Sequence, residues 1–185
     1  MSYAYRIQLP EAQTTVTEEG LWTPELLPLI SESDLHALLR SELVQRGWAE
    51  EDDGSLKGEV EGVQVELLPD RVALRAHLQS EVTVSHIVIA DSDDSVELKA
   101  LRIAEGERQR DRLLTEASEE RGRALTSTLI KLEPHINRLL DETLSAIYPL
   151  ALLQRAEELG EILSVSRSES EEEGLEVTIH VKVDL

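Results

Sequence analysis

A long helical pattern over residues 94–160 most constrains how this 185-residue chain can fold. Its middle, residues 105–123 (EGERQRDRLLTEASEERGR), is charged on nearly every side, so little of it can pack against other elements. Leu113, Leu114 and Ala117 form the only apolar cluster there. An isolated helix this polar is marginally stable in water, so we expect it to dock along Leu113 and Leu114. Two alternatives stay open: residues 105–123 project as an arm toward a partner, or they pack on their own domain.

Beyond residue 125, apolar residues recur three, four or seven positions apart, as on the buried side of a helix. Pro134 fits the first turn of a new helix better than a helix interior, because proline has no N–H to donate. Pro149 predicts a second break or kink, and Gly160 the end of the helical region. The pattern therefore indicates a proline-interrupted region, interpreted as a helical hairpin. The apolar positions are Leu125, Leu129, Leu132, Ile136, Leu140 and Ile147.

Alternating apolar and polar residues predict strands in most of the remaining chain. Residues 3–9 predict a first strand, which Pro10 ends and a polar loop follows. A serine-capped helix is predicted over residues 31–46, then an antiparallel meander within residues 48–78 and a hairpin within residues 162–183. The strands are clustered and do not alternate with helices, which indicates an α+β fold. We expect one domain over residues 1–185, with the N-terminal strand, the meander and the hairpin in an antiparallel sheet packed on the helices.

Two strands invite more specific predictions. Residues 82–90 (VTVSHIVIA) predict one strand, and its continuous apolar run at 87–89 favours a central place in a sheet. In the last strand the alternation is unbroken over nine residues, so we expect Val177, Ile179 and Val181 to be paired in a sheet and buried.

Composition excludes several classes of function. The net charge is −20, from 38 acidic and 18 basic residues, and such a surface repels nucleic acids and anionic membranes. The absence of cysteine rules out disulfides, thiolate metal sites and cysteine nucleophiles. The first residues do not form a signal peptide, and no apolar run approaches the ~20 residues of a membrane helix. We therefore expect a cytoplasmic protein without membrane insertion or nucleic-acid binding.

The stretch HIVIADSDDS, residues 86–95, comes closest to showing chemistry. Asp91 and Asp93 resemble the D-x-D motif of haloacid-dehalogenase-type phosphatases and, with Ser95, the metal site of von Willebrand A domains. Such acids after a strand can hold Mg²⁺. The first motif also requires a downstream lysine and an acidic pair after another strand, whereas Lys99 and Lys131 lie inside helical segments. Ser92 and Asp93 depart from the second motif. Asp94 or Ser95 is better explained as the cap of the following helix.

No catalytic, metal or cofactor site is expected elsewhere. The histidines are scattered without metal-ligand spacing, and no phosphate-binding or nucleophile motif occurs. The arginine-rich helical segment supplies the candidate interaction surface, for which the alternative is an exposed helix stabilised by ion pairs three and four residues apart. The histidines are His36, His77, His86, His135 and His180; the candidate surface comprises Arg108, Arg112, Leu113, Leu114 and Arg121.

Three stretches carry a resemblance to a known family: YAYRIQLP at residues 3–10, DDGSLKGEVEGVQVELLPDRVALRA at 52–76, and GEILSVSRSESEEEGLEVTIHVKVDL at 160–185. They resemble accessory domains of bacterial ternary conflict systems, encoded beside FtsH-like and MoxR-type AAA ATPases and von Willebrand A proteins. The resemblance implies a non-enzymatic adaptor that works with an ATPase, and it transfers no catalytic residues.

Three functions therefore stay open. The first is a non-enzymatic, acidic protein-interaction or adaptor module that acts with an AAA ATPase. Such a module would bind a protein partner, form a homo-oligomer, or do both. The second is a metal-dependent phosphohydrolase that uses Asp91 and Asp93. The third is a nucleic-acid mimic that binds a basic protein, because acidic surfaces attract basic ones.

Overall fold

The computed structural model describes residues 3–170 and 174–182, and divides the chain into two compact units. The first unit comprises residues 1–19 and 77–130, the second residues 20–76 and 131–185. Within the described residues there are two helices and three antiparallel sheets, which confirms the predicted α+β class. The N-terminal strand and the C-terminal hairpin each lie in a two-stranded sheet of their own, so the prediction that they join the meander is wrong.

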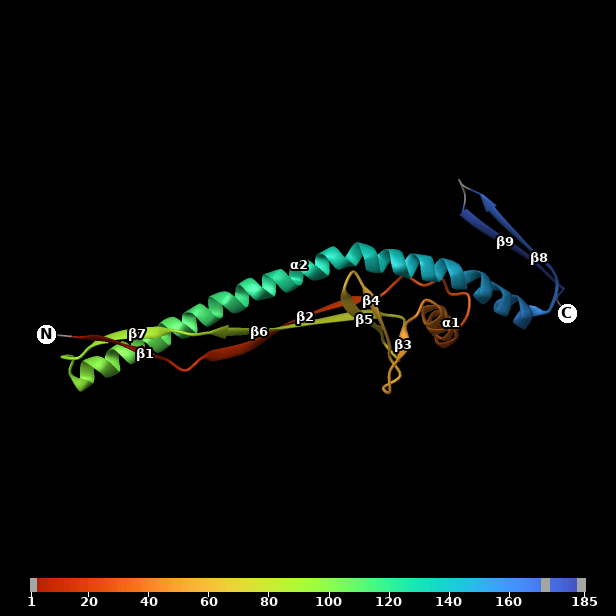
Figure 1. Cartoon of the computed structure of the whole chain (residues 1–185). Helices are drawn as coiled ribbons and strands as arrows, with labels where there is room; N and C mark the ends of the chain where they lie inside the picture. Colours follow the sequence, from red (N-terminus) through yellow and green to blue (C-terminus); the bar gives the residue numbers. More distant parts are fainter. Residues whose placement is uncertain (1–2, 171–173, 183–185) are drawn as a thin grey trace. The chain divides into compact units, whose positions relative to one another are not determined.

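The first unit contains the pair β1 (Ala4–Gln8) and β7 (Ile87–Asp91), labelled in Figure 1. Val88 and Ala90 are buried, whereas Ile87 and Ile89 are exposed, because successive side chains of a strand point to opposite sides. The predicted central position of residues 87–89 is wrong, since β1 is the sole strand partner of β7 among the described residues. The strand predicted over residues 82–90 is likewise two strands, the end of β6 (Leu74–Val84) and β7.

A strand that the sequence did not predict, β2 (Ala12–Trp22), occupies the expected polar loop. Its residues alternate strictly between half-buried and exposed. The half-buried side includes Thr14, Val16 and Glu18. Burial therefore alternates along the strand, although apolar and polar residue types do not. β2 is the first strand of a five-stranded sheet in the order β2-β6-β5-β4-β3.

The second unit holds the predicted meander: β3 (Ala49–Glu50), β4 (Leu56–Val60), β5 (Val63–Leu67) and the start of β6. Leu56 lies opposite Leu67, and both are fully buried. The helix α1 (Glu32–Gln45) begins as predicted, because the Ser31 side chain accepts a hydrogen bond from the Asp34 N–H at 3.1 Å. Its buried residues Leu35, Leu39 and Leu43 form the core of this unit with apolar side chains from β4, β5 and β6.

The helix α2 (Val96–Leu159) runs without interruption for 64 residues. Pro134 and Pro149 both lie inside it, so the predicted new helix at Pro134 and the helical hairpin are wrong. An interior proline costs ~3 kcal/mol, because it removes one hydrogen bond and crowds the preceding turn. The apolar side of α2 stays buried at Leu132, Ile136 and Ile147, and this packing offsets that cost.

The C-terminal hairpin pairs β8 (Glu161–Ser170) with β9 (Gly174–Lys182). Ile179 lies opposite Val165, and Val181 opposite Ile162, which confirms the predicted pairing. Val177, Ile179 and Val181 are only half-buried, however, so the predicted full burial is wrong. The physical reason is that the hairpin has no third strand among the described residues and covers its apolar side incompletely.

Candidate interaction surfaces

The residues after β7 form a helix-capping turn. The Ser95 hydroxyl oxygen accepts a hydrogen bond from the Leu98 N–H at 3.2 Å, which confirms the capping prediction. One Asp94 carboxylate oxygen accepts from the Asp91 N–H at 2.9 Å. The pKa of Glu97, in the first turn, is lowered by its own backbone N–H and then by the Ser95 side chain.

A single arginine, Arg102, forms ion pairs with two carboxylates of this turn, those of Asp91 and Asp94. The Arg102 guanidinium lies 3.1 Å from Asp94 and 3.8 Å from Asp91, and it donates to the Ile89 carbonyl at 3.0 Å. Within the described part of the chain, no group of three or more histidine or acidic side chains is arranged to hold a metal ion. The acids therefore serve to join β7 to the start of α2 in the first unit.

We predict that the melting temperature is unaffected by added Mg²⁺ or Mn²⁺, both in the wild type and in the Asp91→Asn, Asp93→Asn variant. The reason is that Arg102 already neutralises the Asp91 carboxylate that would have to bind the ion. Thermal unfolding with and without each metal, measured by circular dichroism, tests this. A metal-dependent rise of several degrees in the wild type that the double variant loses would restore the phosphohydrolase hypothesis.

The histidines occupy separate places in the fold. His36 Nε2 lies 2.8 Å from the Leu68 carbonyl oxygen, and His135 Nδ1 lies 3.2 Å from a Glu61 carboxylate oxygen. His86 is half-buried beside Gly106, whereas His77 and His180 are exposed.

The five residues of the predicted surface divide between two sides of α2. The Arg108 and Arg112 side chains are 80% and 82% exposed, and Leu113 is 43% exposed. Leu114 is half-buried, and the Arg121 guanidinium donates to the Ser80 hydroxyl of β6 at 2.7 Å. Of the two leucines, Leu113 is the more exposed to solvent.

Residues 105–123 make both surface pairs and contacts with strands of their own unit. Arg112 pairs with Glu116 at 2.9 Å, four residues apart, as expected for an exposed charged helix. Arg110 donates to the Pro10 carbonyl at 3.0 Å, and its guanidinium is largely covered. That this segment also contacts a partner around Leu113 stays a prediction.

Sequence reasoning missed a group of exposed apolar residues, which we call the apolar end. Its seven large side chains lie in or beside β1, β7 and the first turns of α2, and Ile89 among them is 58% exposed. Ile87 and Ile89 lie on one side of the β1–β7 pair, whereas Tyr5, which is opposite the buried Ala90, lies on the other. Lys99 lies over the Tyr5 ring at 5.6 Å. One sequence feature could have indicated these exposed residues. The apolar residues 96, 98 and 101 follow the helix cap closely, and their spacing is not that of a single buried side of a helix. The residues are Tyr3, Tyr5, Ile87, Ile89, Val96, Leu98 and Leu101.

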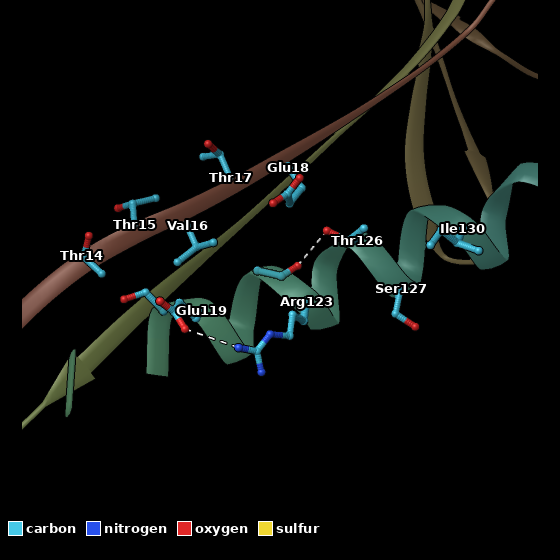
Figure 2. Close-up of a pocket in the computed structure, with 12 residues that line it drawn as sticks. Thr14, Thr15, Val16, Thr17, Glu18, Glu119, Arg123, Thr126, Ser127 and Ile130 are labelled. Atoms are coloured by element: carbon cyan, nitrogen blue, oxygen red, sulfur yellow. Dashed lines mark hydrogen bonds and ion pairs between the residues drawn. The ribbon is translucent and has the colours of Figure 1, made fainter. Parts of the chain in front are cut away.

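A second missed surface is an open groove of about 810 Å³ between β2 and α2, which we call the β2 groove (Figure 2). All its lining residues belong to the first unit. Hydroxyl side chains predominate, with one ion pair between Glu119 and Arg123 at 3.4 Å. No signal in the sequence indicated this groove, because β2 itself was not predicted. The lining is Thr14, Thr15, Val16, Thr17, Glu18, Ser118, Glu119, Gly122, Arg123, Thr126, Ser127 and Ile130.

The arrangement is that of an α+β protein whose candidate metal-binding acids hold a capping turn and which carries exposed apolar residues and an open groove. The chain belongs to the family described as FtsH ternary system domain X5, whose model matches residues 1–183. This confirms the resemblance to ternary-system accessory domains. Searches of curated proteins and of solved structures gave no match. Across the described residues, neither helix is long and apolar enough to cross a membrane.

Proposed function

We propose that this chain is a non-enzymatic interaction module that binds the AAA ATPase of its FtsH ternary system. The observation that carries the proposal is the exposure of Ile87 and Ile89 of the apolar end, which lie together on one side of β7. Large apolar side chains exposed side by side are typical of protein–protein contacts. Membership of an FtsH ternary-system family supports an AAA ATPase as the partner.

Electrostatics supports the same proposal. The net charge of −20 favours a partner surface that is positively charged around an apolar centre, and it speeds the encounter with such a partner. The Asp91 and Asp94 carboxylates pair with Arg102, which disfavours the phosphohydrolase alternative. We also propose that the solvent side of residues 105–123, around Leu113, adds a weaker contact.

We predict that Ile87→Thr with Ile89→Thr weakens capture of the ATPase component at least about tenfold. Threonine keeps the branched side chain that suits a strand, so the loss would come from apolar contact area and not from misfolding. Binding is measured by interferometry with the full-length chain immobilised, after circular dichroism has verified folding. Leu113→Asp should weaken binding less than the double variant.

Val44→Asp is the matched control, because Val44 is similarly exposed but lies on α1 in the second unit. It should bind like the wild type. Equal affinity of the Ile87→Thr, Ile89→Thr variant and the wild type would refute the apolar end as the contact. Sedimentation of each variant tests the homo-oligomer alternative, since loss of a dimer in that double variant alone would identify a second copy as the occupant.

A further inference from the structure

In the part of the chain that the structure describes, the outer edge of β2 has no strand beside it. Among the described residues β6 is the sole strand neighbour of β2, although β2 is 11 residues long. An edge strand presents a row of backbone N–H and C=O groups that can pair with another extended chain. The first unit leaves this row open in its part of β2, residues 12–19.

The β2 groove follows this edge. Successive residues of a strand point to opposite sides, so a cavity beneath one side would be lined by every second residue. The groove is lined instead by five consecutive residues of β2 together with α2. In Figure 2 Val16 points toward α2, and Thr15 and Thr17 lie on the other side of the strand. The open space therefore lies beside the strand, between its edge and the helix.

The lining of the groove offers polar and apolar contacts to an extended polypeptide. At position 122 α2 has no side chain, and a Cβ built there would lie 3.7 Å from both Val16 Cγ1 and Glu18 Oε1, in ordinary van der Waals contact. The Thr126 hydroxyl donates to the Gly122 carbonyl at 3.0 Å, so its oxygen keeps its capacity to accept a hydrogen bond. Ile130, 63% exposed, gives one end of the groove an apolar contact.

The groove contains two carboxylates, and they differ in their ion pairing among the described residues. Glu119 pairs with Arg123, whereas the half-buried Glu18 has no ion-pair partner among the described residues. A strand added beside β2 would bring its side chains within about 5.5 Å of those of β2. A lysine or arginine on that strand would therefore complete a pair with Glu18.

We propose that the β2 groove binds an extended segment of another protein, which adds a strand to the edge of β2 and pairs a basic side chain with Glu18. This is the general mode in which backbone hydrogen bonds give affinity and alternate side chains give specificity. The inference rests on β2 and α2, not on the apolar end, and so does not depend on the partner proposed above.

Two competing arrangements fit less well. A second copy adding its own β2 would bring another charge of −20 and a second Glu18 within the Debye length of about 8 Å. A strand could also add to β6, along the smaller groove of about 430 Å³ that Ser80–Thr83 line with α2. That groove is crossed by the bond between Arg121 and Ser80 at 2.7 Å, which a ligand would have to break.

The test uses two peptides of about seven residues. Threonine occupies every odd position, valine the second and sixth, and the fourth, central position is lysine in one peptide and glutamate in the other. We expect the full-length protein to bind the lysine peptide at least about tenfold more tightly than the glutamate peptide, by fluorescence anisotropy. Glu18→Lys should reverse this preference. Glu18→Gln, which keeps the shape of the side chain, should abolish it and serves if Glu18→Lys fails to fold.

Backbone methylation separates strand addition from simple charge attraction. Methylating the amide nitrogens of one alternating set of residues in the lysine peptide should remove binding, and methylating the other set should leave it, because only one set faces β2. Failure of the wild type to bind either peptide at about 1 mM would overturn the proposal. So would equal effects of the two methylations, or a β2-dependent dimer that Glu18→Lys dissociates. Ile87→Thr with Ile89→Thr should leave peptide binding unchanged, so failure of one surface is distinguishable from failure of the other.

Discussion

Leu39→Ala is expected to lower the free energy of unfolding by about 2–5 kcal/mol, the usual cost of removing a fully buried leucine. Leu39 lies on α1, is 0% exposed and belongs to the core of the second unit. Ile179→Ala removes a similar volume in the same unit, but Ile179 is half-buried in the β8–β9 hairpin. We expect a loss of only about 1 kcal/mol there, because less apolar surface leaves water on folding.

Urea unfolding followed by circular dichroism measures both changes, with the slope m compared among variants to check that the transition is unaltered. The comparison controls for the chemistry of the substitution, since each change deletes a branched aliphatic side chain. A loss at Ile179 as large as the loss at Leu39 would mean that the hairpin is covered in solution, by more of the chain or by another molecule. A loss below about 0.5 kcal/mol at Leu39 would contradict the core itself.

The parts of the fold that the sequence predicted are those that neighbouring residues determine. Ser31 and Ser95 cap the two helices because a hydroxyl two or three residues before an N–H can accept its hydrogen bond wherever the helix lies. The meander was predictable because polar and apolar residues alternate between tight turns, with Gly54 and Gly62 at positive φ. The α+β class follows from such local features.

The errors come from features that distant contacts determine. β2 was not predicted because its helix-facing side uses Thr14 and Glu18 where large apolar side chains are usual. The hydrophobic pattern of a strand is then absent, although the strand forms. Pro134 was expected in the first turn of a new helix. The sequence alone does not show that burial of Leu132 and Ile136 beside it compensates for the missing hydrogen bond.

The candidate surfaces were harder to predict than the fold. Leu113 and Leu114 are adjacent, so their different exposure depends on how α2 is rotated about its axis. Ile87 and Ile89 were expected in a central strand because residues 87–89 form a continuous apolar run. Which side of β7 is covered depends on the contact between Val88 and α2, which is remote in sequence. Predicting the β2 groove would have required predicting β2, its free edge and the position of α2 beside it.

Two glycines of α2 in the first unit should respond to alanine with opposite signs. A Cβ at Gly106 would lie 2.3 Å from Val88 Cγ2 and 3.2 Å from Leu9 Cδ1, whereas a Cβ at Gly122 meets nothing closer than 3.7 Å. Alanine favours a helix over glycine by about 0.8–1 kcal/mol. At Gly106 that gain opposes a collision with a buried, branched side chain that has little rotamer freedom.

We therefore predict that Gly122→Ala raises the free energy of unfolding by about 0.5–1 kcal/mol, and that Gly106→Ala lowers it by about 1–3 kcal/mol, the range for an overpacked core. Urea midpoints for the two variants and the wild type measure the difference. Val88→Ala added to Gly106→Ala should recover part of the loss, because it removes the methyl groups against which the new Cβ collides. If Gly106→Ala stabilises the protein as Gly122→Ala does, α2 does not pack on β7 at this distance, and the arrangement of helix and strands in the first unit is wrong.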